Sequence, residues 1–192
     1  MSAVAKVPVY LSLRDFLNWE PGDGVRYELV NGDPRAMAPA GTIHGLLQNE
    51  LGRLIGNHLR QRNTNCDVLT NPGVIPHLLK SHNFRIPDLG VTCSPTTPNL
   101  AAIPDPVLLI EILSPSNQAD TWSNVWAYTS IPSVQEILVL HSSRMLAELL
   151  GRGSDGAWPE EPQQILGGNL TLASIGFTVP MSNLYARTGL VA

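Results

Sequence analysis

Lysine is scarce in this sequence, which has 12 basic residues against 16 acidic ones and a formal net charge of −4. Its only lysines are Lys6 and Lys80. Because nucleic-acid affinity is carried largely by basic side chains that neutralise phosphates, this balance argues against a broad phosphate-binding surface. A local patch stays open at Arg53, Arg60 and Arg62, although a solvated helix face is the simpler explanation for that segment.

Cysteines and long apolar runs are also few. Cys66 and Cys93 lie far apart with no CxxC spacing, so the spacing signals neither a zinc site nor a disulfide framework. No apolar run approaches the roughly 18 residues of a membrane span, and the N-terminal segment lacks the apolar run of a signal peptide. We therefore expect a protein of the reducing cytoplasm with no membrane partner.

The length and composition bound the domain count. With 192 residues, 43% of them apolar and 15% charged, the chain suits one well-filled core. We expect an N-terminal tail over residues 1–9, a single domain over 10–186 and a C-terminal tail over 187–192.

Turn signals and periodicity predict the first elements. A short helix is expected over residues 10–19, with Ser12 as its N-cap. A hairpin follows over 26–39, where the Asn31-Gly32 dipeptide suits a type I′ turn. The clearest helix covers 42–62, where Thr42 can act as the N-cap and one apolar face is buried.

The rest of the chain predicts a mixed sheet. Strands are expected over 66–70 with 74–79, over 84–93, over 107–114 and over 135–141, and a second helix over 118–129. The segments 145–158 and 170–185 suggest a hairpin and then a terminal strand or short helix. This order predicts an α/β fold of the α+β kind, a central mixed sheet flanked by helices with extra β-hairpins. The strand VLLIEILS is apolar on both faces, which is typical of a central strand.

That central strand contains a carboxylate, Glu111. Burying an ionised carboxylate without a partner costs several kcal/mol, so a cation, a set of donors or a proton must relieve it. Asp88, in the segment RIPDLGVT, is the obvious companion, because neighbouring strands that supply an Asp and a Glu can hold a hard divalent ion. Magnesium is the natural candidate, and a buried pair with Arg or backbone partners is the structural alternative.

Six motifs in order resemble a large bacterial family. They are RYELVNG, MAP with His44 shortly after, IPDLGV, LLIEILSPS, Asp120 with Tyr128 and finally VQEILVLH, and they resemble the Uma-two family of restriction-endonuclease-like proteins. The resemblance implies the PD-(D/E)XK nuclease fold, with Asp88 and Glu111 as ligands of Mg²⁺ or Mn²⁺. It also implies DNA as a candidate partner and a homodimer as a candidate assembly.

The family's lysine is missing from both places where it is expected. Leu113 stands two residues after the glutamate, and Asn124 stands where the family places a lysine on the following helix. Asparagine carries no charge and cannot act as a general acid or base. The resemblance therefore implies either a degenerate endonuclease or a non-catalytic binding module of the same fold, and the acidic net charge agrees better with a protein partner for the latter.

Three further residues are candidates for the same site. His44 is expected to point inward at the first turn of its helix, where it can orient a water or a metal ligand or simply belong to the core. Glu28, beside the Asn-Gly turn, is expected either to face the cavity or to face solvent. Asp120 is expected either to orient the site or to cap its helix.

Overall fold

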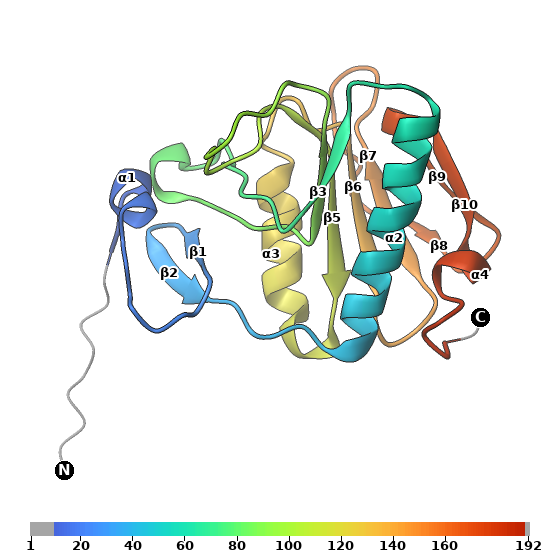
Figure 1. Ribbon diagram of the computed structural model, residues 1–192, viewed down its shortest axis with the longest axis horizontal. Coiled ribbons are helices and arrows are strands. Elements are labelled where there is room, and N and C mark those ends of the chain that lie inside the picture. Colours follow the sequence, from blue (N-terminus) through green and yellow to red (C-terminus); the bar gives the residue numbers. More distant parts are fainter. Residues whose placement is uncertain (1–9, 191–192) are drawn as a thin grey trace, which may run out of the picture.

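In this computed structural model, which describes residues 10–190, a six-stranded mixed sheet is flanked by helices (Figure 1). The strand order is β3-β4-β5-β6-β7-β8, in which only β5 and β6 pair in parallel. The bounds are β3 (Asp67–Thr70), β4 (Leu89–Thr92), β5 (Pro106–Leu113), β6 (Glu136–His141), β7 (Ala147–Gly151) and β8 (Gln163–Ile165). The predicted α/β fold with a mixed sheet is confirmed.

The strand β5 lies between β4 and β6, so its prediction as a central strand is confirmed. Alternate side chains of a strand point to opposite faces. Accordingly, Leu108, Ile110 and Ile112 belong to the core on one face, and Leu109 and Leu113 to the core on the other.

The two long helices cover opposite faces of the sheet. The helix α2 (Thr42–Gln61) packs its buried leucines and Ile55 on the first core, and α3 (Gln118–Tyr128) packs Val125 and Tyr128 on the second. Both helices match the predicted ranges closely. The predicted Thr42 cap is wrong: Gly41 is the N-cap, it makes no side-chain capping bond, and Thr42 is the first helical residue.

The predicted hairpin forms from β1 (Tyr27–Val30) and β2 (Asp33–Ala36). Asn31 and Gly32 have φ angles of 51° and 87°, as a type I′ turn requires. The preceding helix, α1 (Leu13–Leu17), is shorter than predicted but begins after Ser12, whose hydroxyl accepts the Asp15 N–H. A bridge between Leu29 and Phe84 fixes the hairpin beside the segment that leads into β4.

Two strand predictions are too long. Residues 74–79 form no strand, because Pro76 has no N–H to donate and Leu79 takes a left-handed φ of 46°. Only Val74 makes an isolated bridge, with Arg85. The predicted strand over 84–93 is regular only within β4.

The C-terminal region adds a second hairpin to the face that α2 covers. β9 (Asn169–Leu172) pairs with β10 (Phe177–Pro180), and α4 (Met181–Leu184) follows. Three short 3-10 turns complete the described chain, at Lys80–His82, Pro115–Asn117 and Ala173–Ile175. Leu190, from the predicted C-terminal tail, packs against the same core, while residues 1–9 and 191–192 lie outside the described residues.

Cys66 and Cys93 form a disulfide that their spacing did not signal. They stand just beyond the paired ends of β3 and β4, next to the Asp67 and Thr92 pair, so antiparallel register brings together two cysteines that are distant in sequence. Cysteine usage therefore no longer supports the predicted reducing compartment. Within residues 10–190, no helix combines the length and apolar character needed to cross a membrane.

The disulfide should contribute measurably to stability. It closes a loop between residues 27 positions apart, and a loop of that length predicts about 3.5 kcal/mol from reduced entropy of the unfolded chain. We expect dithiothreitol to lower the free energy of unfolding in urea by that amount. The Cys66→Ala, Cys93→Ala double variant should be insensitive to dithiothreitol, and an equal effect of the reductant on this control would contradict the assignment.

Candidate functional site

A cavity of about 230 Å³ opens between the β1–β2 hairpin, the start of α2, the end of β5 and the start of α3. The structure places all six predicted site residues around this one cavity: Glu28, His44, Asp88, Glu111, Asp120 and Asn124. They come from five segments that are distant in sequence. The fold therefore brings together the residues that the sequence singled out.

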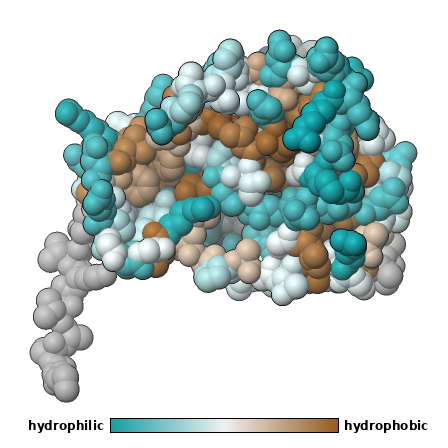
Figure 2. Space-filling view, in the orientation of Figure 1, coloured by the Kyte–Doolittle hydropathy of each residue, from teal (hydrophilic) through white to brown (hydrophobic). Residues whose placement is uncertain are grey.

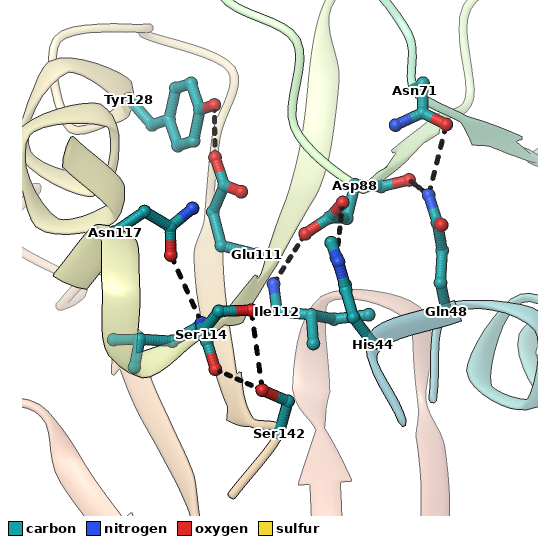
Figure 3. Close-up of polar contacts among 11 residues, drawn as sticks. His44, Gln48, Asn71, Asp88, Glu111, Ile112, Ser114, Asn117, Tyr128 and Ser142 are labelled. Atoms are coloured by element: carbon teal, nitrogen blue, oxygen red, sulfur yellow. Dashed lines mark hydrogen bonds and ion pairs between the residues drawn. The ribbon is translucent and has the colours of Figure 1, made fainter. Parts of the chain in front are cut away.

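Asp88 and Glu111 face each other across two neighbouring strands. The antiparallel register pairs Leu89 with Ile110, so the next pair along is Asp88 with Glu111. Asp88 Oδ2 accepts the backbone N–H of Ile112 at 2.7 Å (Figure 3). The side chain of Asp88 is thus oriented by the strand that carries the glutamate.

Glu111 is held by a tyrosine from the helix that covers its face of the sheet. The Tyr128 hydroxyl donates to Glu111 Oε1 at 2.6 Å (Figure 3). Glu111 is only 7% exposed and Tyr128 is completely buried. The hydrogen bond fixes one carboxylate oxygen of Glu111.

Glu28 faces the cavity rather than solvent. Its Oε1 accepts the Ile86 N–H at 2.7 Å, and the Asn124 amide nitrogen lies 3.3 Å from each of its two oxygens. Asn124, which stands where the resemblance implies a lysine, is therefore hydrogen-bonded to a carboxylate that lines the cavity.

Asp120 stands at the rim. It lies in the first turn of α3 but does not cap it, since the N-cap is Asn117. Its side chain is 71% exposed and pairs with Arg35 from β2, whose Nη1 lies 3.3 Å from Oδ1. This pair links α3 to the hairpin at the mouth of the cavity.

His44 lies at ion-pair distance from Asp88. Its Nε2 lies 2.9 Å from Asp88 Oδ1 (Figure 3), is shielded from solvent and makes no well-formed hydrogen bond within the described chain. Burial lowers the pKa of His44, which favours the neutral ring. The imidazole is therefore placed beside a carboxyl group with which it can share a proton.

Burial raises the pKa of each of the three inner carboxyl groups, and a neighbouring negative charge adds to the rise in each case. Burial, followed by the charge of Glu28, raises the pKa of Asp88 to about 7, although the Ile112 N–H opposes it. Burial and then Asp88 raise the pKa of Glu111 well above its usual range. Burial also raises the pKa of Glu28. The cluster therefore retains protons near neutral pH unless a cation joins it.

The donor set fits magnesium. Within residues 10–190, no three His, Cys, Asp or Glu side chains are grouped closely enough to enclose a metal ion. Mg²⁺, however, needs only one or two carboxylates, because it keeps several waters and takes further oxygens from a phosphate. Asp88 and Glu111, which both line the cavity, supply those two carboxylates.

Sequence reasoning missed three residues that shape the site. The sequence placed Tyr128 in a motif but gave it no role in the site. The signal was Glu111 itself, because a buried Glu in an apolar strand requires a hydrogen-bond donor. Gln48 donates to the backbone oxygen of Asp88 at 2.8 Å, which ties α2 to the start of β4. Arg85 is 2% exposed, donates to the Leu29 carbonyl at 3.0 Å and favours ionisation of Glu28.

Comparisons with known proteins agree with this architecture. Residues 13–182 match a family model, Uma2, described as "Putative restriction endonuclease". An uncharacterized protein of Synechocystis sp. is 28% identical over 177 residues, which is 91% of each chain. The crystal structure of a protein from Anabaena variabilis, titled a putative nuclease belonging to DUF820, superposes with a TM-score of 0.75 at 15% identity, over 93% of this chain and 99% of that one. The predicted restriction-endonuclease-like fold is confirmed.

Replacing Asp88 by Asn should change how stability depends on pH. Because the folded pKa of Asp88, about 7, exceeds its unfolded value, the native state binds more protons between about pH 4 and pH 7, and stability falls as pH rises through that window. The variant has no such charge to bury. It should be more stable than the wild type above pH 7 by on the order of 2 kcal/mol, and equal to it near pH 4, in urea unfolding.

His44, whose lowered pKa gives a contribution of opposite sign, is present in both proteins. Loss of the Asp88 charge also removes one cause of the raised pKa of Glu111, and this changes stability in the same direction as the loss of Asp88 itself. Asp120→Asn is the matched control, because it removes the charge of an exposed carboxylate at the rim of the same cavity and should give a much smaller difference. A stability difference between Asp88→Asn and wild type that is the same at both pH values would contradict the prediction.

Replacing Tyr128 by Phe should destabilise the protein without changing its packing. The substitution removes the donor to Glu111 and leaves a buried oxygen unsatisfied, which costs about 1–3 kcal/mol. Urea unfolding at neutral pH measures the loss. Tyr27→Phe removes a solvent-exposed hydrogen bond, from the half-buried Tyr27 to Asp23, and should cost much less, so equal losses would count against a special role for Tyr128.

Proposed function

We propose, since this chain belongs to the Uma-two family of restriction-endonuclease-like proteins, that its cavity is a Mg²⁺-dependent site for phosphodiester cleavage in DNA, working at a reduced rate. One observation carries the proposal: Asp88 and Glu111, opposed on neighbouring strands, both have a raised pKa and both line one open cavity.

Asp88 and Glu111 would hold Mg²⁺ or Mn²⁺. The bound ion supplies Lewis-acid activation of water and neutralises charge that develops on the phosphate. The protein contributes two oriented oxygens, because the Ile112 N–H fixes Asp88 and the Tyr128 hydroxyl fixes Glu111.

The remaining side chains supply position and proton transfer. Burial lowers the pKa of His44 and so favours its neutral ring, which lines the cavity beside Asp88, where it can orient a water and take up its proton. Arg35, held at the rim by Asp120, offers a guanidinium to a phosphate oxygen. Glu28 positions Asn124 rather than acting on the substrate.

Asn124 sets the reduced rate. Its amide nitrogen can donate a hydrogen bond to Glu28 but supplies neither a proton nor a positive charge. A lysine at this position would place an ammonium group among the carboxylates and beside a bound phosphate. We therefore infer that the step assisted by the lysine is slowed, while Asp88 and Glu111 are retained for metal binding.

Cleavage assays on supercoiled plasmid with Mg²⁺ or Mn²⁺ test the proposal. Slow cleavage by wild type should be lost in Asp88→Asn and Glu111→Gln, which keep the shape of each side chain. Asn124→Lys should raise the rate by about tenfold or more, since acid–base and electrostatic groups contribute roughly 10²–10⁴-fold. Gln118→Lys is the matched control, because it adds the same charge to α3 outside the cavity lining.

Cleavage that survives both carboxylate substitutions would overturn the assigned site. A second candidate function, a non-catalytic binding module of the same fold, is favoured by the uncharged Asn124. It predicts Mn²⁺ binding by calorimetry in wild type without cleavage of DNA by either wild type or Asn124→Lys. DNA as the substrate and a homodimer as the assembly remain proposals.

A further inference from the structure

A second hollow, a groove of about 250 Å³, lies between α2 and the edge strand β3. Its lining residues are Gly52, Arg53, Gly56, Asn57, Arg60, Val68 and Thr70. None of these residues lines the carboxylate cavity. We call this hollow the α2–β3 groove.

The groove is lined by hydrogen-bond donors and by no acid among the residues that the structure describes. Arg53 and Arg60 are one heptad apart, so they lie on the same side of α2, and Asn57 and Thr70 add an amide and a hydroxyl. Arg60 makes no ion pair with any residue in 10–190. In a chain with a net charge of −4, such a lining selects for an anion.

The neighbouring acids do not cancel this character. Asp67 precedes Val68 on β3, and strand alternation directs it to the sheet face away from α2. Glu50 does pair with Arg53, whose Nη2 lies 2.6 Å from Oε1, but it stands outside the groove lining. Hydrophilic side chains accordingly gather over the face that α2 presents in Figure 2.

Two glycines of α2 face the sheet beside the groove. Gly52 and Gly56 lie one helical turn apart, and a Cβ added to either would be in ordinary van der Waals contact, 3.4 Å from Leu89 Cδ2 and from Val68 Cγ1 respectively. Neither position carries a side chain that could fill the groove, so an anion can approach the helix between Arg53 and Arg60.

We propose that the α2–β3 groove binds a backbone phosphate of the DNA whose scissile bond lies in the carboxylate cavity. This inference rests on the proposed function. The helix α2 runs from the cavity, which His44 lines, to the groove at Gly56, 12 residues further (Figure 1). At 1.5 Å per residue, His44 and Gly56 are about 18 Å apart along the helix axis, which is roughly half a turn of B-DNA. This axial spacing suits two phosphates of a single duplex.

Fluorescence anisotropy with a labelled DNA duplex, in EDTA so that no metal-dependent cleavage occurs, tests the groove. Arg60→Glu should weaken binding by about tenfold and reduce the slope of log affinity against log salt by about one. Arg14→Glu makes the same charge change on α1, at the other end of the molecule in Figure 1, and should bind as wild type does. Glu50→Gln should tighten binding, because it releases Arg53 for the phosphate.

A gain of binding cannot arise from misfolding, so Glu50→Gln keeps the test decisive. No binding by wild type, or unchanged binding in both groove variants, would overturn the proposal. If a poly-aspartate peptide displaced the labelled duplex as well as unlabelled DNA does, the groove would be assigned to an acidic protein and not to DNA. No binding by wild type would count against the proposed function as well, whereas unchanged binding in both groove variants would overturn the groove alone. Plasmid cleavage and Mn²⁺ calorimetry of the Asp88 and Glu111 variants test the proposed function separately.

Discussion

Repulsion among carboxyl groups that are buried together is the constraint on which this structure depends. Asp88, Glu111 and Glu28 share a cavity in which burial is the largest cause of each raised pKa. Neutral donors satisfy individual oxygens: backbone N–H groups, the Tyr128 hydroxyl and the Asn124 amide. Such donors relieve the desolvation of a carboxylate but do not cancel its charge. These neutral donors therefore leave the negative charge of the three carboxylates without a matching positive charge.

Pairing between strands that are distant in sequence brings the three carboxyl groups together. The β4–β5 register sets Asp88 opposite Glu111, and the Leu29–Phe84 bridge brings the β1–β2 hairpin, with Glu28, to the same place. These contacts join segments that a chain without tertiary structure would keep apart. Because every strand involved is anchored in an apolar core, the carboxylates cannot move apart to relax their repulsion. Holding the three carboxyl groups together therefore lowers the free energy of unfolding, and a bound cation would offset that loss.

The sequence revealed the parts of this arrangement whose cause is local. A carboxylate inside an apolar strand identifies Glu111 by its cost, and Asn31-Gly32 identifies a turn by its φ angles. Contacts set by tertiary packing left no such signal: the reach of Tyr128 depends on where α3 lies on the sheet, and the disulfide depends on the register of β3 with β4. The apolar composition of residues 74–79 predicts a strand, but Pro76 has no N–H to donate to a neighbouring strand, so none forms. Features with a local cause could be predicted from the sequence, whereas the register of the strands could not.

The exchange of a lysine for Asn124 has a consequence beyond the lost proton donor. An ammonium group near Glu28 and Glu111 would lower the pKa of each carboxyl group, so that fewer protons would have to leave when a cation binds. With an amide there, part of the metal-binding free energy is used to remove those protons. Arg85 offsets this only in part, because burial lowers its own pKa and its charge acts mainly on Glu28. In the site that we propose, metal affinity and hydrolytic rate would thus be coupled through one residue, and a lysine at position 124 should raise both together, with the gain in affinity most marked below the pKa of Asp88.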